Sequence, residues 1–155
     1  METTDIDETG LLIGRLLAET ARIWRYRLDQ RLRHLNLSQS RGVTLLQIYH
    51  SNHLRSAGHE ITQQELADNL AIEAPTLVRL LDRLQDDQLI ERRPDALDRR
   101  VKRIHLKEES LEIIQKVETI AKELEKEIVS QIKKSELQQC LKTLKTIKEN
   151  AHNMS

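Results

Sequence analysis

The chain has 155 residues and a mass of 18.1 kDa, the size of one ordinary domain that can bury a hydrophobic core. Its 38% hydrophobic and 32% charged residues, with only 4 Gly and 2 Pro, exclude a disordered chain and disfavour an all-β one, and the lack of Phe indicates a core of Leu and Ile. One Cys excludes an intrachain disulfide framework, and neither a signal peptide nor a membrane-spanning run is evident, so we expect a cytoplasmic protein without membrane contacts.

The net charge is zero, which by itself argues against a nucleic-acid partner. The distribution of charge argues the other way. Residues 88–107 hold seven basic and three acidic side chains, and all 15 Arg lie at or before Arg103 while every Lys lies at or after Lys102. Because Arg offers a planar fork suited to phosphates and base edges, we expect recognition in the first two thirds of the chain.

In the first third, apolar residues spaced by three to five predict a long amphipathic helix over about 9–34. Ser38 is a good N-cap for a second helix, and we expect a loop at residues 51–60. The segment Thr62–Glu65 has the spacing of a capping box and opens a short helix. A tight turn at 71–74 and Pro75 introduce the next helix, which we expect to run to about Asp87.

Two partly alternating runs, 89–94 and 101–106, predict strands joined by a basic hairpin loop. Two further amphipathic helices follow, with apolar stripes from Leu111 to Ile132 and from Leu137 to Ala151. The expected fold class is therefore mainly α with a small β-hairpin wing: a winged helix-turn-helix with long N- and C-terminal dimerisation helices. We divide it into a dimerisation helix (1–35), a DNA-binding domain (36–107) and C-terminal dimerisation helices (108–155).

In a helix-turn-helix the second helix enters the DNA major groove, and Arg79 and Arg83 project from its exposed face. Pro75 and Thr76 begin that helix, where free N–H groups attract phosphate. The alternative is a solvated face on which Arg79 pairs with Asp82 or Arg83 with Asp87. The hairpin favours DNA, because a basic tip can enter a narrow minor groove; its cations are Arg99, Arg100, Lys102 and Arg103. Asp98 beside them can hold one guanidinium in a bidentate pair and aim the other.

Several segments together resemble the MarR family of transcription regulators, most closely its SlyA-like branch: 22–25, 29–32, 35–39, 43–45, 64–67, 75–82, 89–90 and 98–106. The resemblance implies a homodimer that binds pseudo-palindromic operators as a repressor or activator and is often released by a small aromatic acid. It makes Arg79 the base-reading residue, Arg100 the minor-groove residue and Asp98 its partner. It also places Ser38 and Ser40 against the DNA backbone.

The apolar stripes of the first and last helices exceed what the small middle domain can cover, so we expect them to pair across a two-fold axis. The alternative is an intramolecular bundle of the same helices. The resemblance also implies a cleft for a small aromatic carboxylate, which Trp24 could line with Arg22 or Arg25; packing of Trp24 in the core is the favoured alternative.

Three histidines near the long loop, His50, His53 and His59, with Glu60, raise a metal-responsive regulator as an alternative, although surface histidines explain them more simply. We expect Cys140 to be a buried structural residue. No motif of an enzyme is present, and we expect no cofactor and no bound metal. A winged-helix module that binds protein is the remaining alternative to a DNA-binding regulator.

Overall fold

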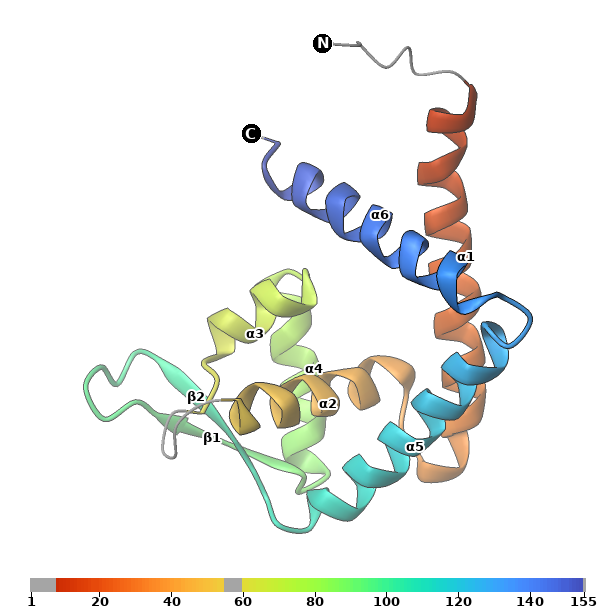
Figure 1. Cartoon of the computed structure of the whole chain (residues 1–155). Helices are drawn as coiled ribbons and strands as arrows, with labels where there is room; N and C mark the ends of the chain where they lie inside the picture. The colour runs from red at the N-terminus through yellow and green to blue at the C-terminus, as the bar shows by residue number, and fades with distance from the viewer. Residues whose placement is uncertain (1–7, 55–59, 155) are drawn as a thin grey trace. The chain divides into compact units, whose positions relative to one another are not determined.

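The computed structural model describes residues 8–54 and 60–154, which form one compact unit ending at Ala121 and a second from Lys122 onward. In chain order the elements are α1 (Glu8–Leu32), η1 (Arg33–Leu35), α2 (Gln39–His53), α3 (Gln63–Leu70), α4 (Ala74–Asp86), β1 (Ile90–Pro94), β2 (Lys102–Leu106), α5 (Ser110–Ile128) and α6 (Lys134–His152) (Figure 1). The mainly helical fold with a hairpin wing, expected from the sequence, is confirmed.

The helix starts follow from local side-chain chemistry. Ser38 caps α2 by accepting a hydrogen bond from the Arg41 N–H, and Thr62 and Glu65 form a complete capping box on α3. The turn between α3 and α4 passes through Ala71, whose φ of 51° lies in the left-handed region. Pro75 sits in the first turn of α4, where a missing N–H costs no helix hydrogen bond.

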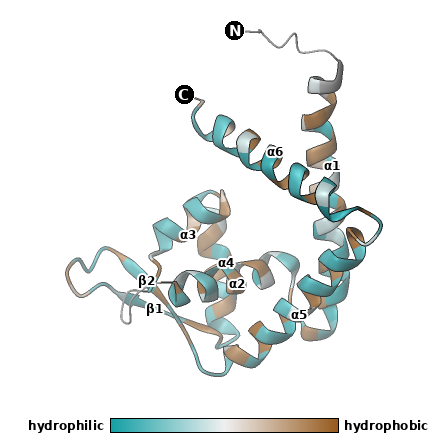
Figure 2. Cartoon of the chain, in the orientation of Figure 1, coloured by the Kyte–Doolittle hydropathy of each residue, from teal (hydrophilic) through white to brown (hydrophobic). Residues whose placement is uncertain are grey.

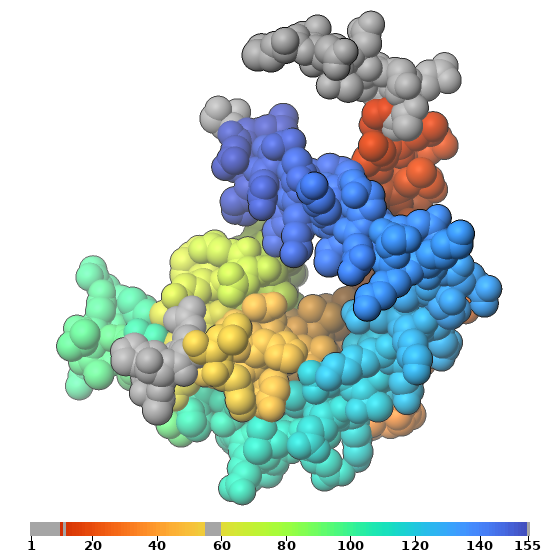
Figure 3. Space-filling model, viewed as in Figure 1, coloured from red at the N-terminus to blue at the C-terminus, as the bar shows by residue number. Residues whose placement is uncertain are grey.

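The wing is an antiparallel pair in which Ile90 lies opposite Leu106 and Pro94 opposite Lys102. The Ile104 N–H donates to the Ile61 carbonyl at 2.9 Å, so β2 is also attached to the segment before α3. In the space-filling view the tip of the hairpin projects beyond α3 (Figure 3). The wing therefore has a fixed base and an accessible tip.

The core of the described residues is aliphatic, as the composition predicts: its fully buried large side chains are Leu, Ile and Val. Hydrophobic residues line the inner sides of α2 and α4 and the start of α5 (Figure 2). Gly42 of α2 packs closely against its neighbours, because a Cβ there would be 2.9 Å from Leu32 Cδ1 and 3.3 Å from Val117 Cγ1. A Cβ at this position would make the Leu32 and Val117 side chains shift, so Gly42 serves close packing rather than backbone conformation.

Some sequence-based expectations were wrong in detail. The loop expected at 51–60 begins later, because α2 continues to His53; residues 55–59 lie outside the described part. The apolar stripe that ends at Ile132 extends beyond its helix, because α5 ends at Ile128. Cys140 is exposed rather than buried, since α6 has no buried residue in the single chain. Trp24 is half-buried rather than a core residue.

In the parts of the chain that the structure describes, no helix combines the length and the apolar character needed to cross a membrane.

Candidate nucleic-acid interface

The outer face of α4 presents polar and basic side chains to solvent. Thr76, Arg79 and Arg83 are all exposed, while Leu77, Leu81 and Leu84 are buried on the opposite side of the helix. This division gives α4 a strongly amphipathic character and leaves its arginines pointing away from the core. The N-cap residue Glu73 makes no side-chain hydrogen bond to the first turn, so its carboxylate does not cap the positive end of the helix.

The ion pairs of α4 differ from those proposed as the solvated-face alternative. Asp82 accepts a hydrogen bond from Arg92 at 2.5 Å, and Asp87 accepts one from Arg41 at 2.5 Å. Both acids thus pair with arginines of other elements. In residues 8–54 and 60–154 the structure records no ion pair for Arg79 or Arg83, so the pairing expected in that alternative is wrong.

The hairpin tip holds one arginine by a carboxylate. The Arg100 Nε and Nη2 each donate to Asp98 at 3.1 Å, to Oδ1 and Oδ2 respectively, and the Arg100 N–H donates to Oδ1 at 3.0 Å. These bonds hold the pKa of Asp98 below its usual range, and the bonds from the Arg100 side chain have the largest effect. The Arg100 side chain is nonetheless 91% exposed, so its outer edge is available to a partner.

The loop of the hairpin is held by a second aspartate, Asp95. Its carboxylate binds the Arg103 guanidinium and accepts backbone N–H bonds from Leu97 at 2.8 Å and Asp98 at 3.1 Å. These contacts, led by Arg103, lower the pKa of Asp95 to about 2. The carboxylate is therefore ionised above about pH 4, where it stabilises the wing fully. This stabilisation is lost only as the pH falls toward 2.

Arg103 differs from the other expected contact residues of the wing. Besides Asp95 it donates to the Glu60 carbonyl at 2.6 Å, and its side chain is only 26% exposed. Arg99 and Lys102 are exposed. The arrangement gives Arg103 a role in attaching the wing to the segment before α3. The sequence pointed to the cation but gave no sign of its partners, because Glu60 is 43 residues away.

The N-terminus of α2 brings two hydroxyls together. Ser38 Oγ lies 3.4 Å from Ser40 Oγ, and Ser40 is exposed. The N-cap bond of Ser38 leaves both hydroxyls near the positive end of the helix. We use the name basic surface for the residues of α2, α4 and the wing that are expected to contact DNA and are at least partly exposed: Ser38, Ser40, Pro75, Thr76, Arg79, Arg83, Asp98, Arg99, Arg100 and Lys102.

Comparison with known proteins agrees with this geometry. A model of the MarR family matches residues 41–101. The solved transcriptional regulator PA3341 is 39% identical, with a TM-score of 0.78, over 92% of this chain and 99% of that one. The chain belongs to the MarR family. The S. aureus MepR–DNA complex is 27% identical over 88% of this chain and 96% of that chain (TM-score 0.79), and a crystal structure of MarR is 26% identical over 99% and 97% (TM-score 0.73).

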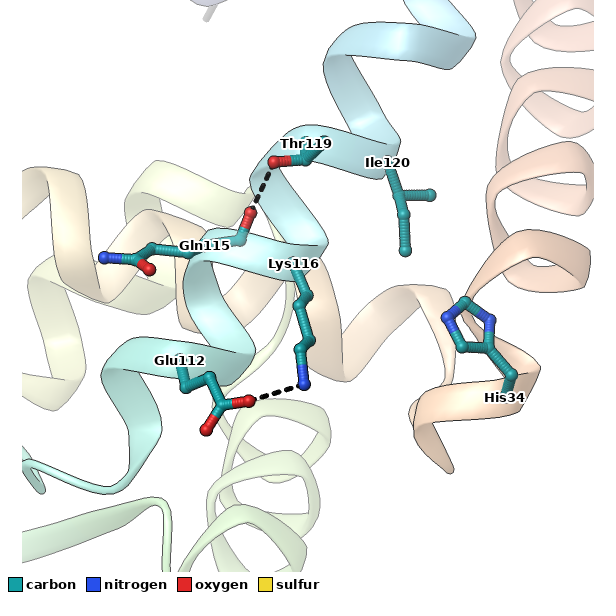
Figure 4. Close-up of a pocket in the computed structure, with 6 residues that line it drawn as sticks. All are labelled: His34, Glu112, Gln115, Lys116, Thr119 and Ile120. Carbon is teal, nitrogen blue, oxygen red and sulfur yellow. Dashed lines mark hydrogen bonds and ion pairs between the residues drawn. The ribbon is translucent and has the colours of Figure 1, made fainter.

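The residues of this MarR-family chain that were expected to hold a small molecule, Arg22, Trp24 and Arg25, are not among the lining residues of a pocket found in the described part of the chain. Arg22 and Arg25 are exposed on α1, on either side of the half-buried Trp24. A pocket of about 410 Å³ lies instead between η1 and α5 (Figure 4); its lining residues are His34, Glu112, Gln115, Lys116, Thr119 and Ile120. Lys116 is paired with Glu112 at 2.6 Å across its wall.

The histidines considered as metal ligands have separate partners. His50 Nε2 lies 3.8 Å from Glu118, and His53 Nδ1 lies 2.9 Å from the Tyr49 carbonyl. His59 lies outside the described residues, and Glu60 pairs with His105 at 3.1 Å. Within the ranges 8–54 and 60–154, no group of three potential metal ligands comes together.

Proposed function

We propose that the chain is a non-enzymatic, cytoplasmic transcription regulator that binds a pseudo-palindromic DNA operator as a homodimer. The observation that carries the proposal is that Arg79, on the outer face of α4, has no ion pair among the described residues and belongs to the same domain as a wing whose Arg100 is held by Asp98. A helix N-terminus in the major groove and an arginine in the minor groove would contact adjacent parts of one half-site.

The proposal assigns a role to each part of the basic surface. Arg79 reads a guanine through two hydrogen bonds, which is the commonest specific contact in the major groove, and Arg83 contacts the next base or phosphate. Arg100 enters the minor groove, with Arg99 and Lys102 on flanking phosphates. Ser38, Ser40, Pro75 and Thr76 contact the DNA backbone from helix N-termini. Arg103 supports the wing from behind.

Two finer assignments belong to the same proposal. The segment Asp98–Arg100 and the Pro75–Arg79 helix start favour the SlyA-like branch of the family. A small aromatic carboxylate could bind beside Trp24, where Arg22 or Arg25 would pair with its charge, and weaken DNA binding. The solved MepR–DNA complex supports a DNA partner by analogy.

The test is binding of Arg79→Ala to two duplexes: an operator selected from a random pool by the wild-type protein, and a scrambled duplex of equal length. Loss of one bidentate base contact costs about 1–3 kcal/mol on the operator, and much less on the scrambled duplex. Lys126→Ala, which removes an exposed cation outside the basic surface, serves as the control.

Equal weakening on both duplexes would reduce Arg79 to a phosphate contact. If the wild-type protein selects no DNA sequence and binds no duplex at low salt, where charge-driven binding is strongest, the regulator proposal fails. A winged-helix module for a protein partner would then be the better explanation.

A further inference from the structure

The helix α4 carries an acidic side chain that can compete with DNA for Arg79. Asp82 follows Arg79 by three residues on α4, and both side chains are exposed. Side chains at this spacing are neighbours on a helix surface and form ion pairs. An unbound Asp82 would therefore sit beside Arg79 and compete with a base edge for its guanidinium.

The structure shows where the Asp82 carboxylate goes instead. Arg92, at the centre of β1, donates from Nη2 to Asp82 Oδ1 at 2.5 Å and from Nε to Gln85 Oε1 at 3.1 Å. The Arg92 side chain is 22% exposed and the Asp82 side chain 51% exposed. Arg92 thus holds α4 at two points one turn apart, and it turns the acid toward the wing.

We propose that Arg92 is a positioning residue for DNA recognition: by binding Asp82 it keeps Arg79 free for the DNA. The inference rests on the proposed role of Arg79. It assigns to Arg92 an electrostatic effect that reaches Arg79 through Asp82. The ion pair also neutralises a carboxylate that would otherwise repel the phosphates of the operator.

A purely mechanical role for Arg92 is less well supported, because the wing has other attachments. Ile90 and Ile104 are fully buried, and Ile104 is hydrogen-bonded to the Ile61 carbonyl. Arg103, the residue before Ile104 in β2, binds Asp95 and the Glu60 carbonyl. These contacts keep the hairpin in place without the pair between Arg92 and Asp82.

The two partners of this pair can be removed separately, with opposite expected results. Arg92→Gln frees Asp82, and it weakens binding to the selected operator by about 25-fold, because an exposed ion pair competes by about fivefold in each of two half-sites. Asp82→Asn breaks the same pair but removes the competitor, so it binds at least as well as wild type. The double variant Asp82→Asn/Arg92→Gln returns to within about threefold of wild type.

Arg93→Gln is the matched control. Arg93 is the next residue of β1 and pairs with Glu91 at 2.7 Å, so its loss removes one cation and frees an acid that is not on α4. It weakens binding less than Arg92→Gln does. Melting temperatures of all variants, measured alongside, show that each is folded.

The inference is overturned by wild-type binding of Arg92→Gln, by weakened binding of Asp82→Asn, or by a double variant that does not recover. Unimpaired operator binding by Arg79→Ala would instead contradict the base-reading role proposed for Arg79. In an Arg79→Ala background, Arg92→Gln costs no more than Arg93→Gln, since the side chain that it protects is gone. A larger cost there assigns Arg92 to the wing alone and overturns the inference as well.

Discussion

Two aspartates three residues apart in the wing have different partners. Asp95 binds backbone N–H groups and Arg103, and it shapes the loop from within. Asp98 binds Arg100, whose side chain remains almost wholly exposed. The first carboxylate stabilises the hairpin, and the second fixes the direction of a cation that faces solvent.

The role of Asp98 leads to a prediction opposite to the one that charge repulsion alone would give. Arg100→Ala weakens operator binding strongly, and Asp98→Ala weakens it too, because the guanidinium loses its orientation. Removing a negative charge near DNA would otherwise strengthen binding by reducing repulsion. Affinities measured over a salt series on an A·T-flanked operator check this.

Asp98→Asn is the intermediate variant, since an amide keeps one acceptor oxygen for Arg100 but carries no charge. Its affinity for the operator lies between those of the wild type and Asp98→Ala. Wild-type or tighter binding by Asp98→Ala would mean that the tip acts only as a basic patch.

For single residues, the sequence predicts whether a side chain is exposed better than it predicts which residue that side chain binds. Exposure of Arg79 and burial of Leu81 follow from a 3.6-residue period, and the contact between Asp98 and Arg100 follows from their proximity in the chain. The pairing of Arg41 with Asp87 spans 46 residues and depends on how α2 meets α4, which no local pattern encodes. The spacing in and after α4 alone pointed to the wrong partners for Asp82 and Asp87.

Among the elements, α1, α2 and α5 pack closely around a position that has no side chain. Gly42 has a buried position between Leu32 and Val117, both with no exposed surface. The boundaries of these helices were largely predictable from caps and periodicity, but the tight crossing was not, because a glycine inside a helix carries no signal about its neighbours.

The close packing around Gly42 and the open space around Gly14 predict opposite effects when each glycine is replaced by alanine. A Cβ added to Gly14, in α1, would meet no atom within 4 Å, so Gly14→Ala gains about 1 kcal/mol of helix propensity. Gly42→Ala gains the same propensity but overpacks the core by about 1–3 kcal/mol, a net loss of about 1 kcal/mol. Urea unfolding of both variants measures the difference.

An equal stabilisation by the two substitutions would show that Leu32 and Val117 yield without cost. The packing of the three helices around Gly42 would then not require a glycine at this position.

At the scale of the whole molecule, the single chain leaves apolar side chains uncovered. Leu12 and Leu16 on α1 are 43% and 54% exposed, and Leu141 on α6 is 55% exposed. Exposed leucines repeated on two long helices are typical of an interface rather than of scattered surface residues. The wrong expectation for Cys140 has the same origin, because an amphipathic pattern does not say whether the covering surface belongs to the same chain.

We therefore predict a homodimer through α1 and the C-terminal helices. Light scattering at micromolar concentration gives a mass about twice 18.1 kDa. Leu16→Glu and Leu141→Glu each shift the mass toward that of one chain, because a buried unpaired carboxylate is costly. Leu97→Glu, at a wing position that is 99% exposed, leaves the dimer intact. A wild-type mass of one chain would contradict the pairing.

The separation of structural and exposed arginines has a consequence for how such a protein changes over evolutionary time. Arg41 and Arg92 contribute to packing between elements, whereas Arg79 and Arg83 have no ion pair in the described residues. A new side chain at position 79 or 83 would leave the contacts that hold α4 in place unchanged. Gene duplication followed by substitution at these two positions could thus produce regulators of new operators on an unaltered scaffold, without compensating changes elsewhere.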